Sequence, residues 1–305
     1  MKHRGTLFGT PRQAMDAIGK TLILSLFVIA GSLIHIPKAE AARCSADGSN
    51  CTYKERTNWY WCGLVYTPRT VRYQVPEGTA PSGGWRTAFF YHGTSPTSIN
   101  PYITYPLLLN AFGADNSPKI FRELLDNPAG TGHKYATFAP NPPATAVVGQ
   151  FWHTNVVFPY SASCDNSFFN DFFAEIKNGS YGSSSQYNLS KRYAYGISSG
   201  GYNASRMAVT FNGSSVWKAL GIVSASYATC AGPLCSVPTL PSNHPPTKFW
   251  HGTSDLIVPM FTMEKYYDKL IASGKTTAKK IHGGGHEFTG DNLGSTGIKN
   301  WFDAY

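Results

Sequence analysis

The sequence predicts a single domain of the α/β class, with a mostly parallel central sheet flanked by helices. Short apolar, aromatic or β-branched runs alternate with segments of helical period, as in strand–helix–strand units around a parallel sheet. No internal repeat and no long linker rich in Ser, Thr or Pro interrupts this alternation. With 42% hydrophobic and 14% charged residues in 305, the composition indicates one folded unit with a substantial core.

The individual elements follow from residue type and period. Strands are expected where β-branched and aromatic residues cluster, and helices where apolar residues recur every three or four positions. The predicted strands are Thr87–His92, Tyr135–Ala139, Tyr193–Ile197, Leu220–Ser224, Thr247–His251 and Ala278–His282. The predicted helices are Lys119–Leu125, Ser167–Lys177, Tyr202–Phe211, Met260–Ser273 and Thr296–Tyr305. Residues 42–63 are predicted to form a polar, cysteine-rich entry segment.

The N-terminal residues have the features of a secretory signal. Basic residues precede an apolar run over 22–36, and Ala39 and Ala41 fit a small-x-small cleavage site. This run is shorter than the roughly twenty residues that span a bilayer. We predict a signal peptide over 1–41, cleaved near Ala41, and a mature domain over 42–305. The protein is therefore expected to be secreted and not membrane-bound after cleavage.

The charge pattern argues against a nucleic-acid partner. Residues 1–41 hold five of the 26 Lys and Arg and two of the 17 Asp and Glu, so the mature chain keeps a net charge of +6. These charges are dispersed, and no run of five like charges follows residue 41. Dispersed charge is typical of a solvated basic surface. The oligomeric state stays open.

The six cysteines all lie beyond the predicted cleavage point. An even count in an exported protein predicts disulfides, although the sequence leaves the pairing open. Short spacing favours the local pairs Cys44–Cys51 and Cys230–Cys235. No Cys-x-x-Cys is present, which argues against a zinc site or a redox motif. A free catalytic cysteine is an alternative that would leave another one unpaired.

Two adjacent serines lie in a predicted strand–turn–helix segment. Gly196 and Gly200 flank Ser198 at a distance of two positions, which is the Gly-x-Ser-x-Gly nucleophile elbow. The central residue of this turn is strained, and side chains two positions away would collide with the neighbouring strand or helix. Ser199 has Ile197 at that distance, so Ser198 is the predicted nucleophile.

The residues of an oxyanion hole are expected in two loops. The backbone N–H of the residue after the nucleophile, here Ser199, usually forms one half. The second half is expected after the early strand, where Thr94 is the predicted N–H donor and Gly93 permits close approach. We expect His92 to be buried and to brace this loop.

A serine hydrolase of this type needs an acid and then a base further along the chain. Asp255 lies in a loop directly after a predicted strand, where a carboxylate reaches the edge of the sheet. Loop aspartates commonly serve as helix caps or turn residues, so this assignment depends on the serine. The other candidate acids are Glu264, Asp268 and Asp291.

Two histidines follow the acid. His282 ends the predicted last strand, whereas His286 follows three glycines that let a loop carry its imidazole over Ser198. His286 is therefore the predicted base, taking the proton of Ser198 while Asp255 fixes its tautomer. The intervening glycines disfavour the helix that a metal-binding i, i+4 pair requires, so we expect no metal and no cofactor.

With these residues in place, the chain resembles the extracellular medium-chain-length polyhydroxyalkanoate depolymerases. The resemblance rests on YGISSGGYNASRMA, WHGTSDLIVP and GGGHEF, their spacing, the signal peptide and the single-domain layout, and it covers nearly all of the mature chain. It implies an α/β-hydrolase fold, export from a bacterium and hydrolysis of water-insoluble polyesters of 3-hydroxy fatty acids. Ser198, Asp255 and His286 match the triad of that family. No separate binding domain is present, which favours the medium-chain group.

Other functions fit the same residues. A secreted carboxylesterase acting on soluble esters, polyhydroxybutyrate or plant cell-wall acyl groups would use the same triad. A non-catalytic polymer-binding protein could keep a degenerate hydrolase fold, and several peptidases share the fold, although no propeller-sized domain is present. Part of the 14% of aromatic residues is expected to form a contact patch for alkyl side chains, with no member identified by sequence.

Overall fold

The computed structural model describes residues 42–305 apart from 96–98, 105–115, 146–148, 155–158 and 231. The predicted signal peptide over 1–41 therefore lies outside the described residues. Within the described part of the chain, no helix is both long enough and apolar enough to cross a membrane.

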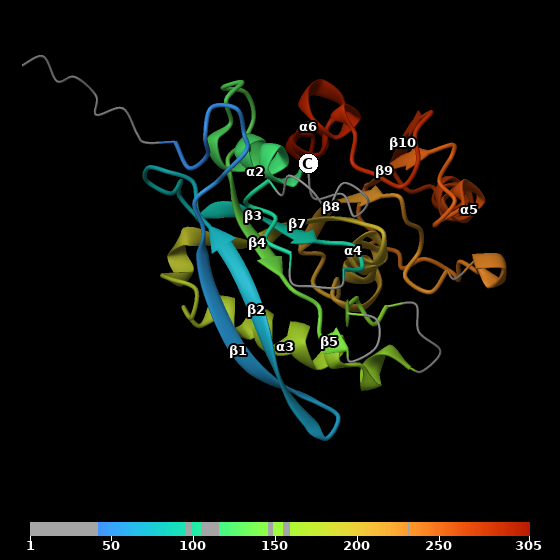
Figure 1. The fold of residues 1–305 in the computed structure, drawn as a ribbon, viewed down its shortest axis with the longest axis horizontal. Coiled ribbons are helices and arrows are strands. Elements are labelled where there is room, and N and C mark those ends of the chain that lie inside the picture. The colour runs from blue at the N-terminus through green and yellow to red at the C-terminus, as the bar shows by residue number, and fades with distance from the viewer. Residues whose placement is uncertain (1–41, 96–98, 105–115, 146–148, 155–158, 231) are drawn as a thin grey trace, which may run out of the picture. The chain divides into compact units, whose positions relative to one another are not determined.

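An eight-stranded sheet in the order β1-β2-β4-β3-β7-β8-β9-β10 forms the centre of the fold (Figure 1). The strands from β4 to β10 in that order pair in parallel, whereas β1 and β2 form an antiparallel hairpin at one edge. The strands are β1 Lys54–Cys62, β2 Val65–Gln74, β3 Trp85–Tyr91, β4 Tyr135–Pro140, β7 Tyr187–Ile197, β8 Trp217–Val223, β9 Thr247–Gly252 and β10 Thr277–His282. A separate short pair consists of β5 Ala144–Thr145 and β6 Gly149–Gln150. The carboxyl ends of the parallel strands therefore share one edge, where catalytic loops collect.

Helices cover both faces of the sheet, because successive side chains of each strand point to opposite sides. Phe90 packs in one buried cluster with Phe121 and Phe302, and its neighbour Phe89 packs in another with Phe172. A third cluster packs Tyr266 against the sheet. The helices are α2 Ser117–Asp126, α3 Cys164–Lys177, α4 Ser199–Thr210, α5 Met260–Ala272 and α6 Ile298–Asp303.

The predicted strands and helices are confirmed in position, but some of their bounds differ, and β2 was not predicted. β7 begins at Tyr187 and α3 at Cys164, both before the predicted starts at Tyr193 and Ser167. The helix predicted from Tyr202 begins at Ser199, immediately after the tight turn. The last predicted helix is shorter, because a 3₁₀ turn and an extended Gly297 precede α6. The prediction that residues 42–63 form a polar entry segment was wrong for residues 54–62, because these residues form β1. Its outward positions carry aromatic residues, so the alternation of polar and apolar residues that marks a half-buried strand is missing.

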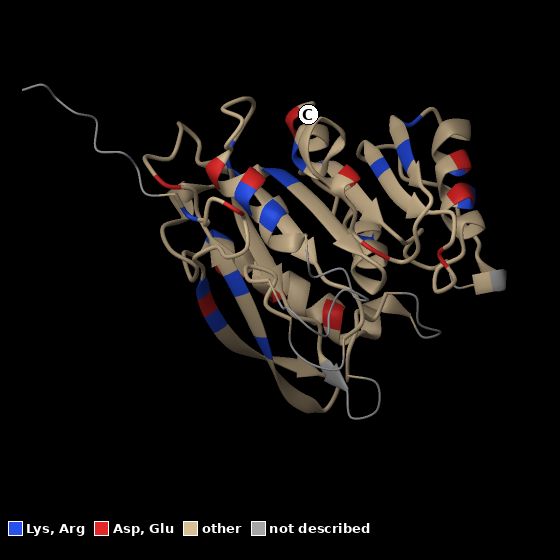
Figure 2. Ribbon diagram, turned by 45° about the horizontal axis from the view of Figure 1, so that its top comes forward, with Lys and Arg blue, Asp and Glu red and all other residues tan. Residues whose placement is uncertain are grey.

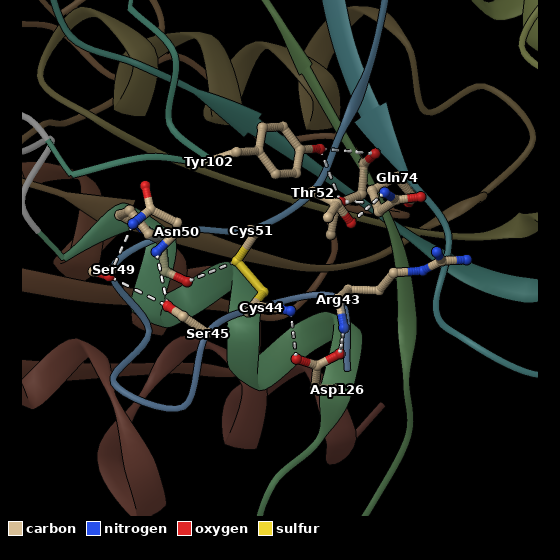
Figure 3. The surroundings of a disulfide bond; sticks show 12 residues. Arg43, Cys44, Ser45, Ser49, Asn50, Cys51, Thr52, Gln74, Tyr102 and Asp126 are labelled. Atoms are coloured by element: carbon tan, nitrogen blue, oxygen red, sulfur yellow. Dashed lines mark hydrogen bonds between the residues drawn. A yellow bond between two sulfur atoms is a disulfide. The ribbon is translucent and has the colours of Figure 1, made fainter. Parts of the chain in front are cut away.

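Three disulfides are present, Cys44–Cys51, Cys62–Cys164 and Cys230–Cys235. Both predicted local pairs are confirmed, and the alternative of a free catalytic cysteine was wrong because none of the described cysteines is free. Figure 3 shows the first pair, beside which Asp126 at the end of α2 accepts hydrogen bonds from two backbone N–H groups. These bonds fix the start of the described chain to the body of the domain.

Candidate active site

The chain turns sharply at Ser198, between the end of β7 and the start of α4. Ser198 has φ +57° and ψ −129°, a conformation that L-residues rarely adopt. Its N–H donates to the Val223 carbonyl at 3.0 Å, and its carbonyl accepts from the Tyr202 N–H at 3.1 Å. The strained backbone is thus held from both β8 and α4.

Three glycines make this turn sterically possible. A Cβ on Gly200 would overlap the backbone carbonyl of Tyr91, and one on Gly196 would collide with the carbonyl of Gly200. A Cβ on Gly201 would lie 2.5 Å from the Cβ of Ala225, so a third glycine is required that the motif does not include. The elbow therefore fits only where β3, β7 and α4 approach at backbone distance.

The structure brings together two of the predicted site residues, Asp255 and His286. The Nδ1 atom of His286 lies 2.8 Å from Oδ2 and 3.0 Å from Oδ1 of Asp255. The other candidate base, His282, instead accepts a hydrogen bond at Nδ1 from the Gly284 N–H at 3.2 Å. The carboxylate is thus placed to orient His286.

The run of glycines after β10 lets two loops lie against each other. A Cβ on Gly252, at the end of β9, would collide with the carbonyls of Gly284 and Gly285. The Ser254 N–H donates to the Gly284 carbonyl at 3.0 Å. Backbone packing of the two loops therefore carries His286 to Asp255.

Asp255 is almost fully buried and fully hydrogen-bonded. Its Oδ1 accepts from the Ile257 N–H at 3.0 Å and from the Val258 N–H at 2.8 Å. Burial alone would raise the pKa of this carboxyl, but hydrogen bonds from His286 and the Val258 N–H outweigh it and hold the pKa below its ordinary value. Asp255 is therefore ionised at neutral pH, as the partner of an imidazolium must be.

A cavity of about 290 Å³ joins the serine turn to the Asp255 loop. It is lined by Thr94, Phe151, Ser198, Ser199, Tyr202, Gly232, Ile257 and Val258. Ile257 and Val258 are the residues whose N–H groups hold Asp255, so serine and carboxylate approach the cavity from different strands. Among the described residues His286 bonds to Asp255, and no hydrogen bond joins it to Ser198. Such bonds are often long in free enzymes and tighten around substrate.

The predicted oxyanion residues Thr94 and Ser199 both line this cavity. His92, at the start of the same loop, is buried, and its Nδ1 lies 2.7 Å from the Gly93 carbonyl. Burial lowers the pKa of His92 to about 4, so the ring is neutral at physiological pH. A buried, neutral ring fits a bracing residue better than a proton carrier.

Comparison with known proteins decides the family. No family model matches the chain. Poly(3-hydroxyoctanoate) depolymerase from Pseudomonas fluorescens is 41% identical over 261 residues, which cover 84% of this chain and 86% of that protein. The chain belongs to the poly(3-hydroxyoctanoate) depolymerase family. Membership of this family makes it a carboxylic-ester hydrolase.

Solved structures place this depolymerase-family chain in the α/β-hydrolase fold. A thermostable esterase superposes with a TM-score of 0.50 at 14% identity, over 82% of this chain and 60% of that one. A ferulic acid esterase gives 0.50 at 13% identity, over 83% and 94% of the two chains. The carboxylesterase of Bacillus cereus gives 0.50 at 12% identity, over 77% and 93%. The predicted single-domain α/β-hydrolase fold is confirmed.

The structure adds Trp152, which the sequence did not single out, to the site of this family member. Its backbone N–H donates to the Ser199 hydroxyl at 2.9 Å, and its indole N–H donates to the His92 carbonyl at 3.0 Å. The fully buried ring stacks on Phe169. Trp152 thus ties together both loops of the candidate oxyanion hole, through contacts that leave no sequence pattern.

A second missed residue is His251, the next-to-last residue of β9, just before the Asp255 loop. It is fully buried, and its Nε2 lies 2.8 Å from the Val258 carbonyl and 3.4 Å from Oδ2 of Asp255. Burial lowers the pKa of His251, so the ring stays neutral. The only signal in the sequence was its place at a strand end four residues before a candidate acid.

The remaining candidate acids lie elsewhere. Glu264 pairs with Lys279 at 3.8 Å, Asp291 pairs with Lys280 at 3.5 Å, and Asp268 lies within α5. In the part of the chain that the structure describes, no group of three or more His, Cys, Asp or Glu side chains is arranged to hold a metal ion.

Proposed function

We propose that this chain is a secreted serine esterase that hydrolyses medium-chain-length polyhydroxyalkanoates of the poly(3-hydroxyoctanoate) type. The catalytic residues are Ser198, His286 and Asp255, and the oxyanion donors are the N–H groups of Ser199 and Thr94. The observation that carries this proposal is the Asp255–His286 pair beside the strained Ser198 turn, in a chain 41% identical to a depolymerase of that name.

In the acylation half, the Ser198 hydroxyl attacks the ester carbonyl and gives its proton to Nε2 of His286. Asp255 accepts the Nδ1 proton of the ring in a hydrogen bond and so stabilises the imidazolium. The carbonyl oxygen, now negative, receives hydrogen bonds from the two N–H donors, each worth about 3 kcal/mol in the transition state. His286 then protonates the alkoxide that leaves, and the alcohol end of the polymer departs.

In the deacylation half, a water molecule attacks the acyl-enzyme and gives one proton to His286. The tetrahedral intermediate collapses when the imidazolium returns this proton to the oxygen of Ser198. The products are a hydroxy acid end and the free enzyme. No metal or cofactor takes part in either half.

Export is supported by two observations. The described chain holds three disulfides, which persist in oxidising compartments. The N-terminal residues fit a cleavable signal. Sequencing the N-terminus of protein recovered from the culture medium tests this directly: a start next to Ala41 is expected, and uncleaved protein held in the cells would contradict it.

A clearing assay with three substrates tests the activity. Wild-type protein is expected to form halos on a poly(3-hydroxyoctanoate) suspension, to clear polyhydroxybutyrate weakly or not at all, and to hydrolyse p-nitrophenyl octanoate. Ser198→Ala is expected to abolish all turnover, whereas Ser199→Ala keeps its backbone N–H and retains a substantial part. Clearing of polyhydroxybutyrate alone, or turnover of soluble esters alone, would contradict the substrate assignment. An active Ser198→Ala would contradict the mechanism.

A further inference from the structure

Large apolar side chains with high exposure gather in two groups on the described surface. The hairpin group consists of Trp59, Trp61, Leu64, Val65 and Tyr66, at the free end of the β1–β2 hairpin. The rim group consists of Leu234, Leu256, Ile257 and Phe261. Leu64 is 97% exposed and Leu256 is 93% exposed. Contiguous apolar surface of this kind usually marks a binding site on a soluble protein.

The inner face of the hairpin fixes it to the body of the domain. Tyr60 is buried and packs edge-on against Phe168 of α3, with 4.9 Å between ring centroids. The disulfide from Cys62 reaches Cys164 at the start of the same helix. The hairpin is therefore held in place by packing and by a covalent bond.

The outer face carries the aromatic residues. Side chains alternate along a strand, so Trp59 and Trp61 point away from the face that buries Tyr60. Tyr66 lies opposite Trp61 in the register, and its ring lies 5.1 Å from that of Trp61 and 5.6 Å from that of Trp59. Tyr66 thus packs against both indole rings, and the three side chains form a platform open to solvent.

The topology places this platform on the catalytic edge of the sheet. β2 runs antiparallel to β4, and Val71 pairs with Pro140 at the carboxyl end of β4 (Figure 1). From Val71, β2 runs back to Val65, so the free end of the hairpin lies about 20 Å beyond the carboxyl end of β4. The Ser198 turn lies beyond the same ends of the parallel strands.

The rim group lies on this edge as well, on the other side of Ser198. Leu256 and Ile257 follow Asp255 in the loop after β9, and Ile257 lines the cavity that contains Ser198. The sheet order places β7, which leads into the Ser198 turn, between the hairpin and β9. The two groups therefore flank the cavity.

The charge distribution defines the chemistry of the partner. No charged residue lies between Arg56 and Arg69, so the free end of the hairpin is uncharged (Figure 2). In the rim loop the only charged residue, Asp255, is buried. In the rim group, Lys265 lies 5.6 Å from the ring centroid of Phe261, so one basic side chain borders this group. The hairpin group has no charged neighbour along residues 57–68, so it offers a nucleic acid or an acidic protein no ionic contact, and an apolar solid fits it best.

We infer that the hairpin group and the rim group form one adsorption face for the surface of the solid polyester, whose alkyl side chains pack on the aromatic platform. This inference rests on the proposed function. A solid cannot enter a cavity, so the polymer surface has to lie against the catalytic edge of this domain for its chains to reach Ser198. The rigid hairpin provides that attachment away from the reacting atoms.

The experiment separates adsorption from catalysis. Adsorption to poly(3-hydroxyoctanoate) particles is measured in the Ser198→Ala background, so that the polymer is not consumed. Adding Trp61→Ser with Leu64→Ser is expected to lower the adsorption constant at least about tenfold, because each side chain loses apolar contact area. The matched control is Ile271→Ser. Ile271 is 54% exposed near the end of α5, toward the amino ends of the parallel strands and away from the cavity.

Soluble-ester turnover checks that the fold and the site are intact. With Ser198 restored, the hairpin variant is expected to hydrolyse p-nitrophenyl octanoate within about twofold of wild type, since no hairpin residue lines the cavity. Its clearing of the polymer is expected to fall in parallel with adsorption.

Several results would overturn the inference. These are unchanged adsorption of the hairpin variant, an equal loss in Ile271→Ser, stronger binding to phosphatidylcholine vesicles than to polymer, or a dimer in ultracentrifugation that the hairpin substitutions dissociate. If the wild-type chain adsorbs through the hairpin group but never cleaves the polymer, the proposed function is contradicted and the adsorption face is supported.

Discussion

The two halves of the candidate site are held in place by different forces. On the elbow side, backbone atoms of β3, β7 and α4 meet so closely that Gly196 and Gly200 have no room for a Cβ. On the acid–base side, Asp255 and His286 are held by hydrogen bonds between side chains and loop N–H groups. The elbow is fixed by shape, whereas the Asp255 carboxylate and the His286 ring are oriented by hydrogen bonds and charge, on loops that pack closely at Gly252.

This difference separates two kinds of substitution. Changes at the elbow should disturb fold and catalysis together, because the same contacts that position Ser198 also pack the domain. Changes at the acid–base pair should remove catalysis and leave the fold nearly intact, because an uncharged side chain of similar shape can occupy the same place.

The largest effect is expected from Asp255→Asn. The amide fills the site of the carboxylate but no longer fixes the tautomer of His286 or stabilises its charged form, so kcat on p-nitrophenyl octanoate should fall about 10⁴-fold. The melting temperature should change by no more than about 3 °C. Glu264→Gln is the matched control and should keep full activity, since Glu264 pairs with Lys279 on the surface, away from the candidate site. Equal losses of activity in the two variants would contradict the claim that the charge of Asp255 positions and stabilises His286.

Gly200→Ala should have the next largest effect and should act on stability as well. The new Cβ would overlap the Tyr91 carbonyl, so the elbow has to shift. We expect a loss of about 3 kcal/mol in unfolding free energy and of at least about 100-fold in kcat/KM. Gly213→Ala is the control, because a Cβ there meets no atom within 4 Å. Normal activity in Gly200→Ala would show that the turn is not fixed by shape.

The pH dependence of stability should show two separate windows. Burial lowers the pKa of both His92 and His244 from 6.5 to about 4, so their contributions are complete above pH 6.5 and are lost as pH falls towards 4. The pKa of Asp255 lies below its ordinary 3.8, so its contribution is lost only at lower pH.

Urea unfolding between pH 7 and pH 4 tests the first window. His92→Gln should reduce the loss of stability by up to roughly 3 kcal/mol, whereas Asp255→Asn should change the slope less, because over this range it acts only through the Asp255 charge that raises the pKa of His251. A change of slope in Asp255→Asn as large as that in His92→Gln would contradict the separation of the two windows.

Trp152→Phe should have the smallest effect. It keeps the ring stacked on Phe169 but removes the indole N–H that binds the His92 carbonyl, so kcat should fall about tenfold with KM nearly unchanged. Trp301→Phe is the matched control. It removes the hydrogen bond, also 3.0 Å long, that the Trp301 indole N–H donates to the Leu220 carbonyl where α6 packs on the sheet, and it should keep full activity. Equal kinetics in the two variants would mean that Trp152 does not position the oxyanion loop.

Features that backbone sterics require could be predicted from the sequence, whereas residues positioned by tertiary contacts could not. The elbow could be predicted because a strained turn accepts only glycine at fixed positions, and His286 could be chosen over His282 because three glycines precede it. Trp152 acts through contacts distant in sequence, which no spacing records. His251 contacts Asp255 and Val258, only four and seven residues later, but its burial against them appears only in the fold. The hairpin was missed because its outward side chains are aromatic, so that an exposed face resembled a buried one.

The central claim is that Ser198 is the nucleophile activated by His286. Covalent labelling with a fluorophosphonate, followed by mass spectrometry of the peptides, tests it most directly. We predict one label per chain on Ser198, loss of esterase activity in proportion to labelling, and at least about 100-fold slower labelling in His286→Ala. A label on Ser199, or labelling of Ser198 at the same rate without His286, would contradict the account.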